Sequence, residues 1–181
     1  MESIVIERAK PGDVKKLQEI GRFTFSESFA HLNSEEDMQN YLEQSFAEEK
    51  LNIELTNKDS QIYFALSDER IVGYLKINVR SAQTENIDIN AFEIERIYVM
   101  KEFHGKKVGQ MFYQKAIDIA QNMNAAFVWL GVWVHNDRAQ SFYKKNGFVV
   151  FDKHIFKLGN DIQTDLMMKK MLTGNENTAK I

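Results

Sequence analysis

The sequence predicts a single-domain α/β protein in which one mixed sheet carries helices on both faces. Its 181 residues are 44% hydrophobic and 12% aromatic, which is enough for one good-sized core and rather short for two. Strand and helix patterns follow one another in the order strand, helices, hairpin, strand, helix, strand, helix, hairpin. No repeat or linker interrupts them, so we expect one domain over residues 1–172 and a polar, disordered tail over 173–181.

The first half of the chain supplies a strand, helices and a hairpin. Residues 3–9 alternate like an edge or half-buried strand, and a helix with a broad apolar face follows. Ser34 is a candidate N-cap for a second helical stretch. From residue 61 the period changes, and two β-branched and aromatic runs joined by the polar turn at 67–70 predict a hairpin. Residues 81–90 are polar and predict a loop.

The second half begins with a strand at 91–99, which alternates with period two, and a helix at 108–123 with an apolar stripe. The almost wholly apolar run 125–134 is typical of a central strand covered on both faces. Asn136 is a candidate N-cap for a short helix that ends just before Gly147. Two last strands, at 148–157 and 162–171, flank "KLGND", whose glycine and asparagine suit a tight turn.

Composition and charge exclude several classes of function. With 23 Lys and Arg against 26 Asp and Glu, the net charge of −3 gives no general attraction to nucleic acid or anionic membrane and favours cationic partners. The absence of cysteine excludes disulfides, thiolate catalysis and cysteine-bound metal, and the four histidines lack metal-ligand spacing. The sequence has no signal-peptide core and no apolar run of roughly 18 residues, so we expect a cytoplasmic protein.

The segment "EFHGKKVGQMF" at 102–112 carries the first candidate binding site. A strand, a glycine-containing turn and a helix follow one another here, an arrangement in which free amides at the helix start can point at an anion. Lys106 and Lys107 would add positive charge. A solvated helix start accounts for the same residues equally well, since the segment has neither of the common nucleotide-binding glycine patterns.

Gly131 and Tyr143 are two further residues with competing interpretations. Glycine inside a bulky central strand marks a bulge or the close approach of another backbone or a ligand, although Trp129 and Trp133 can simply need room. Tyr143 lies one turn before the end of the helix that begins at Asn136, where an aromatic residue is by default part of the core.

Two motifs together resemble the GCN5-related N-acetyltransferase (GNAT) superfamily. "IERIYVMKEFHGKKVGQMFYQKAI" is similar to its cofactor-binding segment, with the core motif Q/R-x-x-G-x-G/A, and "WLGVWVHNDRAQSFYKKNGF" to the following strand and helix. The second motif is in register from Asn136 to Phe148. The resemblance covers roughly residues 3–172, and "HIFKLGNDIQTDLMMKKML" with the paired glutamates of "FEIERIYV" is similar to the bacterial polyamine N-acetyltransferase branch.

The resemblance implies a mostly antiparallel sheet of about seven strands, splayed between the fourth and the fifth, that binds acetyl-CoA. The strand end would offer backbone groups to the pantetheine arm, the following loop would wrap the pyrophosphate, and Asn136 would reach the pantetheine or acetyl end. Tyr143 would be the general acid, because a phenol stays protonated at neutral pH and can give a proton to the departing thiolate. The implied cofactor-binding residues are Ile97, Tyr98, Val99, His104, Gly105, Lys106, Lys107, Val108, Gly109, Gln110, Asn136 and Tyr143.

The chain departs from the core motif at two positions. His104 replaces Gln or Arg at position one, and Lys107 replaces glycine at position four, whereas Gly109 matches at position six. Lys107 must keep its side chain away from the diphosphate while its amide still faces it. These departures place cofactor affinity in question more than they do the fold.

Glu93 and Glu95 are the candidate bases. They are two apart on one predicted strand and point to the same face, where a carboxylate pair can attract a cationic amine and take its proton directly or through water. The alternative is a pair of solvated or ion-paired carboxylates. In superfamily members whose base lies on the next strand, the position of Gly131 is a carboxylate, so we expect Glu93 or water to act here.

We therefore expect an acetyl-CoA-dependent N-acetyltransferase that acts on a small primary amine, first of all a polyamine such as spermidine or spermine, without a metal. The alternatives are acetylation of protein amino termini or other small amines, and a catalytically silent CoA-binding regulatory module. A DNA-binding regulator is disfavoured because the sequence has no basic recognition helix. Edge strands permit a homodimer without requiring it.

Overall fold

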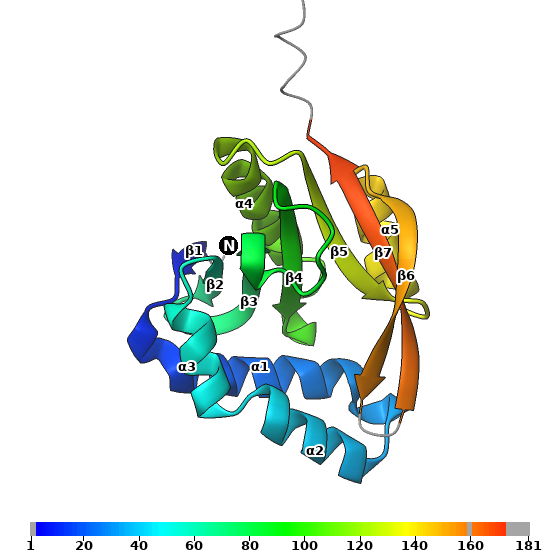
Figure 1. The fold of residues 1–181 in the computed structure, drawn as a ribbon. Coiled ribbons are helices and arrows are strands. Elements are labelled where there is room, and N and C mark those ends of the chain that lie inside the picture. Colours follow the sequence, from blue (N-terminus) through cyan, green and yellow to red (C-terminus); the bar gives the residue numbers. More distant parts are fainter. Residues whose placement is uncertain (1–2, 159–160, 173–181) are drawn as a thin grey trace, which may run out of the picture.

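The protein folds around one mixed β-sheet (Figure 1), as a computed structural model shows. The structure describes residues 3–158 and 161–172. Within these residues the sheet has seven strands in the order β1-β2-β3-β4-β5-β7-β6. The predicted tight turn at "KLGND" and the predicted tail at 173–181 lie wholly or partly outside the described residues. The strands are β1 (Ile4–Arg8), β2 (Ser60–Ser67), β3 (Arg70–Val79), β4 (Ala91–Val99), β5 (Phe127–Trp133), β6 (Val149–Leu158) and β7 (Asp161–Met171).

Helices cover both faces of this sheet. Ion pairs between α3 and the strands β3 and β4 place α3 on one face, together with α1, whereas Phe112 of α4 contacts the opposite face at Gly73 of β3. In Figure 1, α1, α2 and α3 lie together at the lower side of the sheet, away from α4 and α5. The α-helices are α1 (Val14–Phe29), α2 (Glu35–Ser45), α3 (Glu48–Thr56), α4 (Val108–Asn122) and α5 (Asp137–Lys145).

Strands β4 and β5 separate shortly after they begin. They are parallel and pair only from Ala91 to Glu93 on β4 and from Phe127 to Trp129 on β5. Beyond these residues β4 stays paired with β3, and β5 stays paired with β7. All other strand pairs are antiparallel. The predicted fold class, a mostly antiparallel sheet splayed between its fourth and fifth strands, is therefore confirmed.

A β-bulge in β4 puts two neighbouring charged residues, Glu95 and Arg96, on one face. Ile77 of β3 pairs with Ile94, but the next residue of β3, Lys76, pairs with Arg96, so Glu95 is the extra residue of β4. A bulge bends its strand and re-aims the side chains around it. Here Glu95 and Arg96 both project toward Glu54 and Lys76, on the α3 side of the sheet.

The structure confirms several local predictions. The side chain of Asn136 accepts a hydrogen bond from the Ala139 amide (3.1 Å) at the start of α5, and Gly147 follows its end with a φ of +88°. The strand at 125–134 was expected to be covered on both faces, and the consecutive residues Val128, Trp129 and Leu130 of β5 are buried, which confirms this. Gly131 is exposed, at a point where β5 has already parted from β4.

Candidate active site

The loop between β4 and α4 turns at two left-handed residues. A short 3₁₀ turn, Lys101–Phe103, leads into His104, and Gly105 then adopts a φ of +82°. Lys107, the residue before α4, adopts a φ of +67° and a ψ of 6°. This is the left-handed region in which side chains with a Cβ are disfavoured. The lysine that departs from the core motif therefore occupies a backbone conformation that favours glycine.

The first turn of α4 presents free amide groups beside open space. The Met111 amide donates to the Lys107 carbonyl (3.0 Å), so the amides of residues 108–110 have no partner within the helix. A Cβ at Gly105 or Gly109 would meet no atom within 4 Å. Val108 is buried and anchors the turn to the core. The loop thus has the geometry of an anion-binding cradle, with room for the anion in front of it.

Polar and charged side chains of this loop are held by neighbours. The Lys106 ammonium lies 4.3 Å from the centroid of the Phe103 ring, so its charge stays beside the loop. Gln110 donates to Asn146 Oδ1 (3.1 Å), which ties the first turn of α4 to the end of α5. Two elements that would contact the cofactor are therefore connected directly.

His104 connects the loop to the end of β4. Its Nε2 lies 2.8 Å from the Val99 carbonyl oxygen, and its Nδ1 contacts the Arg138 guanidinium of α5. Nε2–H therefore donates and Nδ1 accepts, which is the neutral imidazole. Partial burial, followed by the nearby Arg138 charge, lowers the pKa of His104, while the Val99 carbonyl opposes the shift.

The end of β4 offers backbone groups to the splay. The Met100 amide donates to Val72 of β3 (2.9 Å), and backbone groups alternate sides along a strand, so those of Val99 and Ile97 face away from β3. The Val99 carbonyl is taken by His104. Tyr98 stacks on Tyr74 of β3, with ring centroids 5.8 Å apart. Ile97 and Val99 thus border the gap with backbone, and Tyr98 borders it with an aromatic ring.

Tyr143 lies on α5, and Asn136 precedes its first residue as the N-cap. The Tyr143 ring is buried against Phe142 and Phe148, with centroids 5.2 and 5.6 Å away. Burial raises the pKa of Tyr143 above its ordinary value, so the phenol is protonated at neutral pH. The Asn136 side chain acts as the N-cap of α5. Its carboxamide nitrogen is not needed for that role.

Glu93 lies where β4 and β5 part. Its carboxylate accepts hydrogen bonds from the Thr84 amide (2.9 Å), the Thr84 hydroxyl and the Asn78 side chain (2.9 Å). It is only 2% exposed. Burial raises its pKa, with a further contribution from Glu95, and the hydrogen bonds from Thr84 and Asn78 only partly offset this. A buried carboxylate with a raised pKa has the properties of a general base.

Glu95 has different surroundings. It forms ion pairs with Lys76 (2.7 Å) and Arg96 (2.9 Å). Both cations also pair with Glu54, so two carboxylates and two cations form one ion-pair network. Burial opposes the ionisation of Glu95, but Arg96 and Lys76 outweigh it and lower its pKa to about 2. Asn78 contacts both glutamates, which confirms that Glu93 and Glu95 share a face. Glu95 is a poor proton acceptor, because its charge is stabilised by two cations.

Asp165 is a carboxylate at the splay that sequence reasoning missed. It lies on β7 directly opposite Trp133 of β5 and His154 of β6. A Cβ at Gly131 would lie 3.6 Å from Asp165 Oδ2 and 3.4 Å from His154 Cε1. The β5–β7 register is continuous through Gly131, so the glycine marks the close approach of side chains and not a bulge. The order of strands in the sheet brings these residues together, and no local signal in the sequence gives that order.

The comparisons with known proteins agree with this geometry. The model of the acetyltransferase (GNAT) family matches residues 23–148. The chain belongs to this family. It is 38% identical over 172 residues to an uncharacterized N-acetyltransferase in the pepI 3' region of Lactobacillus delbrueckii subsp. lactis, covering 95% of this chain and 99% of the other. It is also 27% identical to the spermidine N(1)-acetyltransferase of Thermoplasma acidophilum, covering 83% and 91%.

Solved structures of GNAT proteins share the fold. PaiA N-acetyltransferase from Thermoplasma acidophilum, in complex with coenzyme A, is 26% identical with a TM-score of 0.77, covering 94% of this chain and 99% of the other. The ribosomal-protein-S18-alanine N-acetyltransferase of Escherichia coli has a TM-score of 0.70 at 12% identity, which shows the fold alone. This GNAT protein is an acetyl-CoA-dependent N-acetyltransferase. The open glycines and free amides before α4 fit the diphosphate of such a cofactor.

Across residues 3–158 and 161–172, no group of three or more histidine or acidic side chains is arranged to hold a metal ion. None of the helices in the described part of the chain is both long and apolar enough to cross a membrane.

Proposed function

We propose that this enzyme acetylates a polyamine such as spermidine or spermine. The observation that carries the proposal is a row of carboxylates along the sheet face on the α1 side of the splay: Glu93 of β4 is level with Trp129, and Asp165 of β7 is level with Trp133, with His154 and Glu85 near it. A face with several carboxylates attracts a polycation and holds its amines near the splay. The similarity to a spermidine N(1)-acetyltransferase supports the same substrate class.

The chain's own residues would hold acetyl-CoA on the α4 side of the splay. The loop from His104 to Gln110 would hold the diphosphate, with the amides of residues 108–110 as donors and Lys106 and Lys107 as nearby charges. Ile97, Tyr98 and Val99 at the edge of β4 would bind the pantetheine arm, and Asn136 at the start of α5 would reach its far end. Bound acetyl-CoA supplies an activated acetyl group as its thioester. The protein contributes orientation of the amine against it.

Tyr143 is the proposed general acid. The buried phenol retains its proton at neutral pH, since burial raises its pKa, and the hydroxyl is the group that gives this proton to the departing sulfur. The packing of the ring against Phe142 and Phe148 fixes the direction of the hydroxyl. Tyr143 therefore acts after the amine has attacked.

Glu93 is the proposed base, directly or through water. An ammonium ion must lose a proton before its nitrogen can attack, and Glu93 has a raised pKa and lies where β4 and β5 part. Glu95 was the other candidate base from the sequence, which favoured Glu93 or water. Its ion pairs with Lys76 and Arg96 favour a structural role, in which it fixes β4 next to Glu93.

A coupled thiol-release assay with a panel of amines tests this proposal. The panel contains spermidine, spermine, a monoamine and a peptide with a free amino terminus, each with saturating acetyl-CoA. We expect the highest kcat/KM for the polyamines. A preference for the peptide would assign the enzyme to amino-terminal acetylation, and no thiol release with any amine would leave a silent CoA-binding module.

A further inference from the structure

The face of the sheet opposite α4 carries a carboxylate at the mouth of the splay. Asp165 is directly opposite Trp133 in the β5–β7 register, so the two side chains lie on the same face with their Cβ atoms about 5 Å apart. The neighbouring position on β5 is left open by Gly131, and Asp165 Oδ2 lies 3.6 Å from the point where a Cβ would be. The Asp165 carboxylate thus lies in contact with the side-chain position that Gly131 leaves empty.

Within the described residues, the cationic partner of the Asp165 carboxylate, His154, lies too far away for a hydrogen bond. His154 Nε2 is 3.8 Å from Asp165 Oδ2, and His154 Nδ1 is 3.8 Å from Glu85 Oε1, both beyond hydrogen-bond length. The Nδ1 atom is buried and has no hydrogen-bond partner in the described part of the chain. Burial raises the pKa of Asp165, while His154 partly opposes the shift. Burying a carboxylate without a close cation is unfavourable, and a cationic ligand would relieve that cost.

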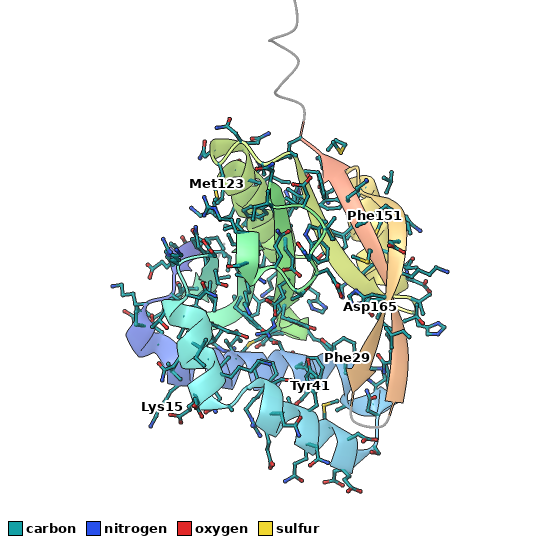
Figure 2. All side chains as sticks on the ribbon, in the orientation of Figure 1. Lys15, Phe29, Tyr41, Met123, Phe151 and Asp165 are labelled. Carbon is teal, nitrogen blue, oxygen red and sulfur yellow. The ribbon has the colours of Figure 1, made fainter. Side chains whose placement is uncertain are left out.

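Aromatic side chains surround the same place. Phe29 of α1 contacts Tyr98 of β4 and Trp133 of β5, with ring centroids 6.4 and 6.3 Å away, so it spans the two strands that part. All three rings are partly exposed. Trp133 links this aromatic group to the carboxylate, because it is directly opposite Asp165 in the β5–β7 register and contacts Phe29. Figure 2 shows Phe29 and Tyr41 on the helices below Asp165.

We propose that Asp165 and the rings of Phe29, Tyr98 and Trp133 form the site that binds an ammonium group of the acceptor. This inference rests on the proposed polyamine activity and deepens it. The carboxylate supplies charge, and the aromatic faces attract the cation and exclude water from the aliphatic chain between amines. Asp165 and Phe29 lie on the acceptor side of the splay, opposite α4, so they select the amine, whereas Tyr98 also borders the proposed pantetheine path.

The test compares Asp165→Asn with Asp152→Asn, which removes the same charge from an exposed position of β6. Spermidine binding is measured by calorimetry with coenzyme A present, and acetyl-CoA affinity and circular dichroism are measured for each variant. We expect Asp165→Asn to weaken spermidine binding about 10- to 100-fold. We expect Asp152→Asn to weaken it less than about twofold, with acetyl-CoA affinity unchanged in both variants.

A second variant tests the aromatic part of the site. Phe29→Leu keeps an apolar side chain and removes the ring, and we expect spermidine to bind about 2- to 5-fold more weakly. Equal spermidine affinity in wild type and Asp165→Asn would overturn the inference, and so would absence of spermidine binding to wild type. If wild type binds spermidine through Asp165 but does not acetylate it, the inference stands and the proposed activity fails.

Discussion

Lys107 provides a quantitative test of the loop that precedes α4. Its φ of +67° lies in the left-handed region, where a residue with a Cβ costs roughly 1 to 2 kcal/mol relative to its preferred conformations. Glycine removes that cost but loses about 0.5 to 1 kcal/mol more backbone entropy on folding. The difference predicts that Lys107→Gly stabilises the protein by about 0.5 to 1 kcal/mol. For a chain of this size that is a rise in Tm of about 1 to 4 °C.

Lys107→Ala is the matched control for this substitution. Both variants remove the ammonium group, but alanine keeps the Cβ and therefore the backbone cost. We expect the Tm of Lys107→Ala to stay within about 1 °C of wild type and the affinity for coenzyme A to fall equally, about 2- to 5-fold, in both variants. Differential scanning calorimetry and a coenzyme A titration measure the two quantities. A Tm of Lys107→Gly at or below that of Lys107→Ala would refute the assignment of strain to this residue.

Three further predictions concern catalysis and pH. Tyr143→Phe should lower kcat at least about 100-fold with acetyl-CoA affinity within twofold of wild type, and an unchanged kcat would remove the general-acid role. Glu95→Gln should cost about 3 kcal/mol at pH 7 by urea unfolding. Because the pKa of Glu95 is lowered to about 2 in the folded state, the unfolded state binds more protons than the folded state between about pH 4.5 and 2. Wild type should therefore lose this stability as pH falls through that window, and the variant should not. The pKa of His104 is also lowered in the folded state, so its contribution to folding stability should be complete above about pH 6.5 and be lost as pH falls below that value. A constant Tm difference between wild type and His104→Gln from about pH 7.5 to 5 would contradict this.

The parts of the fold that local patterns determine were predictable. The helix from Asn136 to Gly147 was defined by a capping side chain and a glycine with positive φ, and both features are present. Residues 91–99 were predicted as a strand from their period of two, and β4 has those bounds. The departure of Lys107 from glycine was visible in the sequence, and the structure adds that this position has a left-handed backbone.

The surroundings of Glu95 and the position of Asp165 depend on contacts between residues far apart in the chain. Alternation correctly put Glu93 and Glu95 on one face, but it could not show the bulge that brings Arg96 to the same face and pairs it with Glu95. Asp165 meets Gly131 because β7 lies between β5 and β6, an order that hydrophobic periodicity does not determine. The sequence therefore named Glu93 and Glu95 as candidate bases, but the ion pairs that separate their roles and the position of Asp165 were beyond sequence reasoning.

The most direct test of the account is the ratio of kcat/KM for spermidine to that for a peptide with a free amino terminus, measured with saturating acetyl-CoA. The acidic face at the splay, with Asp165 and Glu93, predicts a ratio well above about 10, and a fall of that ratio in Asp165→Asn. A ratio below 1 in wild type would contradict the assignment of a polyamine acceptor.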